Sequence, residues 1–275
     1  MRPVTRGFPL DRAAFARRYG ARAVFAMVHL RPLPGSPLWE GSMERVLDAA
    51  LADARAIEAA GASGIVVENF GDRPFAKRAG PVTIAAMARA VSAIASAARI
   101  PVGVNVLRND GAGALAIAAA TGASFIRINV HTGAMLTDQG VIEGDAAGVL
   151  RERAALGVEV AIFADWRVKH AVPIAELDPE QSARDLRERG LADAVVVSGT
   201  ATGSPADPAR LRFLRETLPG TPLVIGSGLR KENAAALAEL ADAAIVGTSV
   251  KRGGIAGAPI DRRRLQTLLT RFRGG

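Results

Sequence analysis

The stretch "AAGASGIVVENF", residues 59–70, contains the repeating unit from which the fold is predicted. A helical pattern ends in small residues, a tight turn with glycine follows, and the apolar run 65–67 leads into Glu68 and Asn69. A short, continuous apolar run is typical of a strand covered on both faces by helices in a parallel sheet. The stretch therefore predicts a βα unit whose strand ends in polar residues.

Working outward from this unit, the same rhythm recurs along the whole chain. The predicted strands are Val24–His29, Gly64–Asn69, Val102–Leu107, Phe125–Val130, Val158–Trp166, Ala194–Gly199, Leu223–Ser227 and Ala243–Thr248. The predicted helices between and after them are Met43–Ala60, Val82–Ala97, Gly111–Thr121, Gly144–Leu156, Pro179–Arg189, Pro208–Thr217, Lys231–Leu240 and Asp261–Phe272. Capping residues or early prolines begin several of these helices, and glycines end several.

Eight βα units predict an α/β protein with one domain, a (β/α)8 TIM barrel over residues 23–275. An open doubly wound sheet is the alternative. It would carry a G-x-G-x-x-G phosphate motif after the first strand, where "HLRPLPGSP" (29–37) stands instead. Residues 1–22 are expected to form a short N-terminal helical extension, in which a helix over Asp11–Arg18 would cover one end of the barrel.

Composition narrows the classes of function. The chain has no cysteine, which excludes disulfides, thiolate metal sites and a cysteine nucleophile. No apolar run approaches the ~18 residues that span a bilayer, and no signal peptide is recognisable, so a cytoplasmic protein without a transmembrane segment is expected. The net charge of +8 is spread along the chain and aromatic residues are only 4%, so nucleic-acid binding is not expected.

Polar residues collect at the predicted strand ends, which in TIM barrels form the active face. The candidates for acid–base chemistry are His29, Glu68, Asp165, Lys169 and His170. A histidine paired with a carboxylate suits proton transfer near neutral pH. Lys169 could form a Schiff base if its pKa were depressed, or could bind an anion.

Other polar side chains near the strand ends suit hydrogen bonding to a substrate. These are Asn69, Asn105, Arg108, Asn109, Arg127, Asn129, Asp138 and Thr200. Asp138 lies in a long loop after the fourth strand, of a kind that often acts as a lid. Oxygen ligands at this face could also hold Mg²⁺, but no compact metal motif is present, so the metal stays open and no other cofactor is predicted.

Two glycine loops predict a phosphate site. Gly226, Ser227 and Gly228 follow the seventh strand. Gly247, Thr248 and Ser249 follow the eighth, with Lys251 nearby. Phosphate in such barrels is often held after strands seven and eight, where glycines let backbone N–H groups approach the anion. The stretch "ADAAIVGTS" (241–249) also resembles the last-strand motif of phosphate-binding barrels such as the tryptophan synthase alpha chain.

Longer motifs resemble the BtpA family, whose members include SgcQ-like proteins. They are "MVHLRPLPGSP" (27–37), "GIVVENFGDRPF" (64–75), "GVNVLRND" (103–110), "FIRINVHTGAMLTDQGVIEG" (125–144), "FADWRVKHA" (163–171), "GSGLRKENA" (226–234), "IVGTSVKRGG" (245–254) and "PIDRRRL" (259–265). They occur in order over residues 23–272. The resemblance implies a TIM barrel of the phosphate-binding kind, and some family members are named for a role in photosystem I biogenesis.

Two hypotheses follow. The first is a TIM-barrel enzyme, a lyase, isomerase or glycosidase, that acts on a small sugar phosphate or ribose-phosphate compound by acid–base chemistry at the barrel mouth. The alternative is a non-catalytic biogenesis or stability factor for a membrane protein complex, which would associate with the membrane only peripherally. Under either hypothesis we expect a homo-oligomer, because barrels of this type commonly self-associate.

Overall fold

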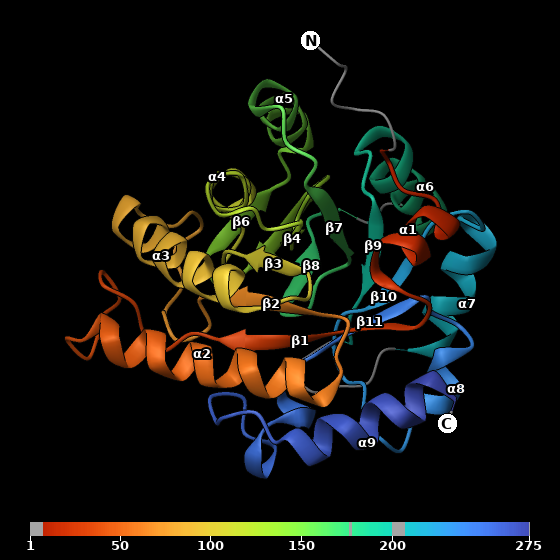
Figure 1. Ribbon diagram of the computed structural model, residues 1–275. Coiled ribbons are helices and arrows are strands. Elements are labelled where there is room, and N and C mark those ends of the chain that lie inside the picture. Colours follow the sequence, from red (N-terminus) through yellow and green to blue (C-terminus); the bar gives the residue numbers. More distant parts are fainter. Residues whose placement is uncertain (1–7, 176–177, 200–206, 275) are drawn as a thin grey trace.

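The computed structural model describes residues 8–175, 178–199 and 207–274 of the chain. Eight parallel strands close into a barrel with helices around it (Figure 1). The barrel strands are β1 (Ala23–His29), β2 (Gly64–Glu68), β3 (Val102–Asn105), β4 (Phe125–Ile128), β7 (Ala161–Trp166), β9 (Ala194–Val197), β10 (Leu223–Ile225) and β11 (Ala243–Val246). Their order around the ring follows the chain, and β11 closes the ring by pairing with β1. The predicted (β/α)8 barrel is confirmed.

The outer helices match the predicted amphipathic segments at most positions. They are α1 (Arg12–Tyr19), α2 (Met43–Ala60), α3 (Pro81–Ala97), α4 (Gly111–Thr121), α5 (Ala146–Leu156), α6 (Pro179–Arg184), α7 (Pro208–Thr217), α8 (Ala234–Ala238) and α9 (Arg262–Arg273). Short 3-10 helices, η2 (Thr248–Val250) and η3 (Arg252–Gly254), follow β11.

Two predicted helices differ from the structure. The segment 179–189 begins as α6 but continues in π-helical form as η1 (Asp185–Arg189). The segment 231–240 is helical only over α8. Asn233 explains the late start, because its side chain accepts from the Arg230 N–H at 2.8 Å and donates to the Gly228 carbonyl at 3.0 Å. These bonds hold the preceding residues in a turn.

The sequence did not predict a small antiparallel sheet formed by the loops after β4 and β7. It consists of β5 (Ala134–Thr137), β6 (Gly140–Glu143) and β8 (Ala171–Pro173). Its register places Leu136 opposite both Val141 and Val172, and all three side chains are exposed. Strands of three or four residues give too short a period-2 pattern to separate them from a loop.

The interior of the barrel is aromatic toward the amino ends of the strands. Phe25, Phe125 and Phe163 point inward, with the rings of Phe125 and Phe163 stacked at 4.5 Å between centroids. Helix α1 closes this end, because Phe15 and Tyr19 enter the same cluster. The N-terminal helical extension is therefore confirmed, and its cap makes this end of the barrel a packed core.

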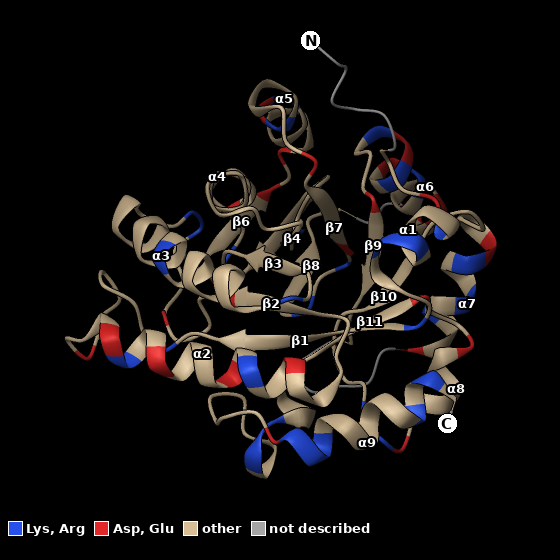
Figure 2. Ribbon diagram, in the orientation of Figure 1, with Lys and Arg blue, Asp and Glu red and all other residues tan. Residues whose placement is uncertain are grey.

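Toward the carboxyl ends of the strands, the inward positions become polar. The register pairs His29 with Glu68, Glu68 with Asn105, and Asn105 with Arg127 on neighbouring strands. Paired residues of parallel strands point to the same side, so these groups share one layer of the interior. Figure 2 shows that most charged residues otherwise lie on the helices and loops. None of the described helices is both long and apolar enough to cross a membrane.

Candidate functional site at the barrel mouth

A cavity of about 690 Å³ opens at the carboxyl ends of the strands. Inward-facing His29, Glu68, Arg127 and Lys169 line it together with both glycine loops. All six residues predicted to bind phosphate contribute to its wall, namely Gly226, Ser227, Gly228, Gly247, Thr248 and Ser249. The predicted phosphate-binding residues and three of the five acid–base candidates, His29, Glu68 and Lys169, therefore meet in one cavity.

Both glycine loops, which line this cavity, contain backbone N–H groups without an acceptor among the described residues. The N–H groups of Ser227 and Gly228 donate to no acceptor in the described part of the chain. Thr248 and Ser249 begin η2, and the first N–H groups of a helix have no partner within it. Four residues of the wall thus have N–H groups without an acceptor among the described residues, at the loops where the sequence predicts phosphate.

Gly226 has no room for a side chain, and a Cβ atom at Gly247 would make a tight contact. A Cβ atom at Gly226 would lie 2.5 Å from Ser198 Oγ and 3.2 Å from an Arg127 nitrogen. A Cβ atom at Gly247 would lie 3.2 Å from His29 Cε1. The N–H of Gly226 donates to the Val197 carbonyl at 2.8 Å, so this residue gives the loop its close approach and does not supply a donor.

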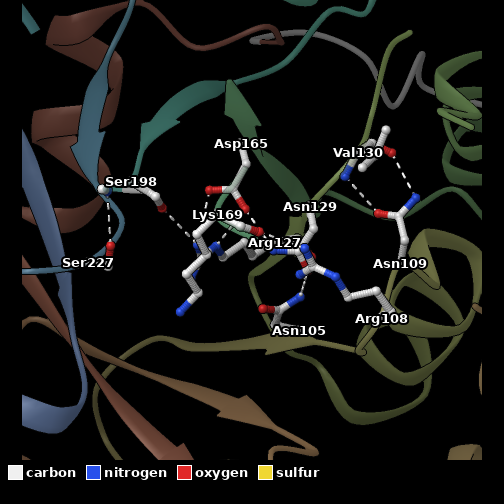
Figure 3. A network of polar contacts seen from close by, with 11 residues as sticks. Asn105, Arg108, Asn109, Arg127, Asn129, Val130, Asp165, Lys169, Ser198 and Ser227 are labelled. Atoms are coloured by element: carbon white, nitrogen blue, oxygen red, sulfur yellow. Dashed lines mark hydrogen bonds and ion pairs between the residues drawn. The ribbon is translucent and has the colours of Figure 1, made fainter. Parts of the chain in front are cut away.

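Arg127 forms the floor of the cavity and is held there by a buried network (Figure 3). Its Nη2 and Nε donate to the two carboxylate oxygens of Asp165 at 3.0 and 3.2 Å. Asn129 donates to the same carboxylate at 2.7 Å, and Asn105 donates to Asn129 Oδ1 at 3.2 Å. Asp165 does not line the cavity and is nearly inaccessible. The geometry makes it the counter-ion that orients Arg127.

Glu68 and Lys169 line the same cavity, and the pKa of each is shifted from its ordinary value. Burial raises the pKa of Glu68, and burial followed by the nearby Arg127 charge lowers the pKa of Lys169. Both shifts favour the neutral form of each group, which is the condition for exchanging protons with a substrate near neutral pH.

His29 is a neutral partner of Glu68. Its Nδ1 lies 2.7 Å from the Ala256 carbonyl, which can only accept, so Nδ1 carries the hydrogen. The other nitrogen, Nε2, lies 3.7 Å from Glu68 Oε2. Burial, together with the Lys251 charge, lowers the pKa of His29 to about 3. Its ring also stacks on Phe70 with centroids 4.4 Å apart, which fixes its orientation.

Three residues predicted to bind substrate use their polar groups to hold loops. The Asn69 side chain accepts from the Leu107 N–H at 2.7 Å and donates to its carbonyl at 3.3 Å. Asn109 bonds both backbone groups of Val130. Arg108 donates to the Lys169 carbonyl at 2.7 Å, so it positions the loop that carries Lys169. None of the three lines the main cavity.

The remaining candidates lie away from the cavity wall. His170 and Asp138 are exposed, and neither lines the cavity. Asn105 and Asn129 are buried in the network beneath Arg127. Thr200 lies outside the described residues. Among the described residues, no three histidine, aspartate or glutamate side chains converge as a metal-binding group, and a role for Mg²⁺ stays a prediction.

Lys251 has a structural role that the sequence did not indicate. Its Nζ lies 3.0 Å from Asp53 Oδ2, and Asp53 also accepts from the Ile260 N–H at 2.8 Å. The pair is buried and ties the segment after β11 to α2.

Sequence reasoning also missed several cavity residues. Phe70, Lys231, Arg263 and Arg264 line the wall. The available signal was position, because Lys231 follows the first glycine loop and the two arginines begin the helix after the last strand.

Comparisons with known proteins bear on the family and the fold of this chain. An uncharacterized protein of Thermococcus kodakarensis is 48% identical over 85% of this chain and 88% of its own. The photosystem I biogenesis protein BtpA of Synechocystis is 45% identical over 90% and 86%. Thiamine phosphate pyrophosphorylase from Pyrococcus furiosus has the same fold, with a TM-score of 0.60 at 14% identity over 92% of this chain and 96% of its own. The BtpA family model matches residues 20–273, and the chain belongs to the BtpA family.

Proposed function

We propose that this protein is an enzyme that acts on a small phosphorylated metabolite by acid–base chemistry at the barrel mouth. One observation carries the proposal: a single cavity is lined by four residues whose backbone N–H groups have no acceptor among the described residues, together with buried Glu68 and partly buried Lys169, whose pKa values are shifted. Perturbed titratable groups in a cleft are candidates for catalysis. The fold, which thiamine phosphate pyrophosphorylase shares, is compatible with this but does not choose the reaction.

Each side chain has a role in this proposal. The N–H groups of Ser227, Gly228, Thr248 and Ser249 hold the phosphate. Glu68, whose pKa is raised by burial, is the proton donor, and Lys169, whose pKa is lowered by burial and by the Arg127 charge, is the acceptor. Arg127, fixed by Asp165, stabilises negative charge that develops on the substrate. Isomerisation, lyase chemistry and glycosidic cleavage all need such a proton donor and acceptor. We therefore propose the class of substrate, and the reaction is one of these three.

The test is calorimetric titration of the protein with inorganic phosphate, ribose 5-phosphate and other sugar phosphates. We compare the wild type with Gly247→Asp, which brings a carboxylate to the cavity wall. Gly220→Asp is the matched control, because Gly220 is outside the cavity and a Cβ atom there meets nothing within 4 Å. We expect Gly247→Asp to weaken phosphate binding by at least about tenfold, through charge repulsion and through its tight contact with His29, while Gly220→Asp binds like the wild type.

The proposal is wrong if no phosphorylated compound binds, or if Gly247→Asp binds as tightly as the control variant. Thermal unfolding of both variants checks that each is folded. A bound compound then becomes the substrate candidate for turnover assays with Glu68→Gln and Lys169→Gln.

A second candidate function has one observation in its favour. Leu136, Val141, Val172 and Ile174 are exposed on or beside the small sheet, and none of them lines the cavity that holds the glycine loops. Exposed apolar patches often mark protein interaction sites, and one relative is named for photosystem I biogenesis. If docking is the function, Leu136→Asn combined with Val172→Thr should abolish co-sedimentation with membranes of the producing cells. Under this second function, the protein would not bind phosphate, or loss of phosphate binding would leave the co-sedimentation unchanged.

A further inference from the structure

A basic rim extends the cavity beyond the glycine loops. It consists of Lys231 from the segment after β10 and of Arg263 and Arg264 from the first turn of α9. Figure 2 shows this concentration of positive charge at the start of α9. The proposed acid–base chemistry uses none of these residues.

Other residues of the protein neutralise the positive charge of the rim only weakly. The side chain of Arg263 has no hydrogen bond or ion pair with another described residue. Arg264 Nε lies 3.9 Å from Asp261 Oδ2, and Lys231 Nζ lies 3.8 Å from Glu232 Oε1, both at exposed positions. Ion pairs this long and this exposed contribute little. The rim therefore keeps positive charge available for a ligand.

The whole cavity has more positive charge than one phosphate group needs. Apart from Glu68 and Lys169, to which the proposed function assigns proton transfer, its lining includes the basic side chains Arg127, Lys231, Arg263 and Arg264 and one carboxylate, Glu232. Asp165 balances Arg127 from beneath. The positive charge that remains lies mainly on the rim, on Lys231, Arg263 and Arg264.

The two cationic groups come from opposite sides of the glycine loops. Arg127 belongs to β4, which lies four strands from β11 in the ring of eight and so faces it across the barrel. Arg263 and Arg264 belong to α9, which follows β11 on the outside. A cavity of about 690 Å³ is in the range that holds a drug-sized ligand, so it can contain more than one phosphate group.

We propose that Lys231, Arg263 and Arg264 form a second anion subsite, and that the natural substrate carries two phosphate groups. One phosphate lies at the glycine loops, as in the proposed function on which this inference rests. The other lies at the basic rim, where arginine forks match phosphate oxygens. The substrate class is thus a bisphosphate or a diphosphate ester.

The experiment compares matched ligand pairs by calorimetric titration. The pairs are fructose 6-phosphate with fructose 1,6-bisphosphate, ribose 5-phosphate with ribose 1,5-bisphosphate, and phosphate with diphosphate. In at least one pair we expect the doubly phosphorylated ligand to bind at least about tenfold more tightly, with a steeper loss of affinity as salt is raised. In a bisphosphate the two phosphate groups are attached to different atoms of the sugar, whereas in a diphosphate they are directly linked. The ligand pairs therefore test both spacings between the two phosphate groups.

The variant that tests the rim is Arg263→Gln with Arg264→Gln, both at exposed positions. It should remove the preference for the second phosphate and leave monophosphate affinity within about twofold of the wild type. Arg262→Gln is the matched control, because Arg262 is in the same helical turn but does not line the cavity. It should keep the preference.

Two results would overturn the inference while the proposed function survives. In the first, monophosphates bind and no doubly phosphorylated partner binds more tightly. In the second, the preference persists in the Arg263→Gln, Arg264→Gln protein. If no phosphate compound binds at all, the proposed function and this inference fail together.

Discussion

Asp165 is the residue whose role changes most between sequence and structure. At the end of a strand it is a natural candidate for proton transfer, but its carboxylate is used by Arg127 and Asn129. The sequence predicts that Arg127 and Asp165 both lie at the mouth. It does not predict that their side chains meet across neighbouring strands, because pair geometry depends on the register of the closed barrel.

Asp165→Asn should destabilise the protein by about 3 kcal/mol, because it leaves the Arg127 charge buried without a counter-ion. Replacing both residues together, as Arg127→Met with Asp165→Leu, should cost less than this single change. Urea denaturation measures both. Asp138→Asn, at an exposed position of the same face, should change the free energy of unfolding by less than about 0.5 kcal/mol. Equal effects of Asp165→Asn and Asp138→Asn would contradict the ion-pair role.

His29 gives a pH-dependent prediction. Its folded pKa of about 3 lies below its ordinary value, so between these two values the unfolded chain binds more protons than the folded one. Stability due to this residue is therefore complete near neutral pH and is lost as the pH falls through that window. His29→Gln should reduce the slope of unfolding free energy against pH between pH 4 and 6 by up to about 1.4 kcal/mol per pH unit. The exposed His170→Gln should reduce it less, and an unchanged slope in His29→Gln would refute a neutral, buried His29.

At the scale of elements, the barrel strands were predictable from their continuous apolar runs, and the long helices from an apolar period that extends over several turns. The small sheet and the start of α8 were not. The sheet of β5, β6 and β8 consists of strands too brief to show a period, and α8 starts late because Asn233 bonds both ends of the preceding turn. The glycine loops were predictable because their position after the last two strands is set by chain order alone.

Helix α1 provides the test at this scale. Phe15 is buried against Tyr19 and Phe163 at the closed end of the barrel. Phe15→Ala should lower the free energy of unfolding by about 3 kcal/mol or more, because it leaves a cavity that rigid strands cannot fill. Arg17→Ala, on the exposed side of the same helix, should have an effect below about 0.5 kcal/mol. A similar, small effect of both changes in chemical denaturation would mean that α1 does not seal the barrel.

At the scale of the whole molecule, the residues that pack the core and the residues of the candidate site lie at opposite ends of the barrel. Aromatic rings and α1 fill one end, and ionisable groups and open N–H donors occupy the other. This division was predictable from the sequence, because polar residues follow the strands and small residues precede them. The basic rim was not, since the start of α9 approaches the glycine loops only after the ring closes.

The central claim is that four backbone N–H groups hold a phosphate, and amide NMR during a titration with phosphate and ribose 5-phosphate tests it most directly. The account predicts saturable shifts of the Ser227, Gly228, Thr248 and Ser249 amide signals with one common dissociation constant, while the Gly220 signal stays fixed. Shifts confined to surface arginines, or no saturable shift at these four amides, would contradict it.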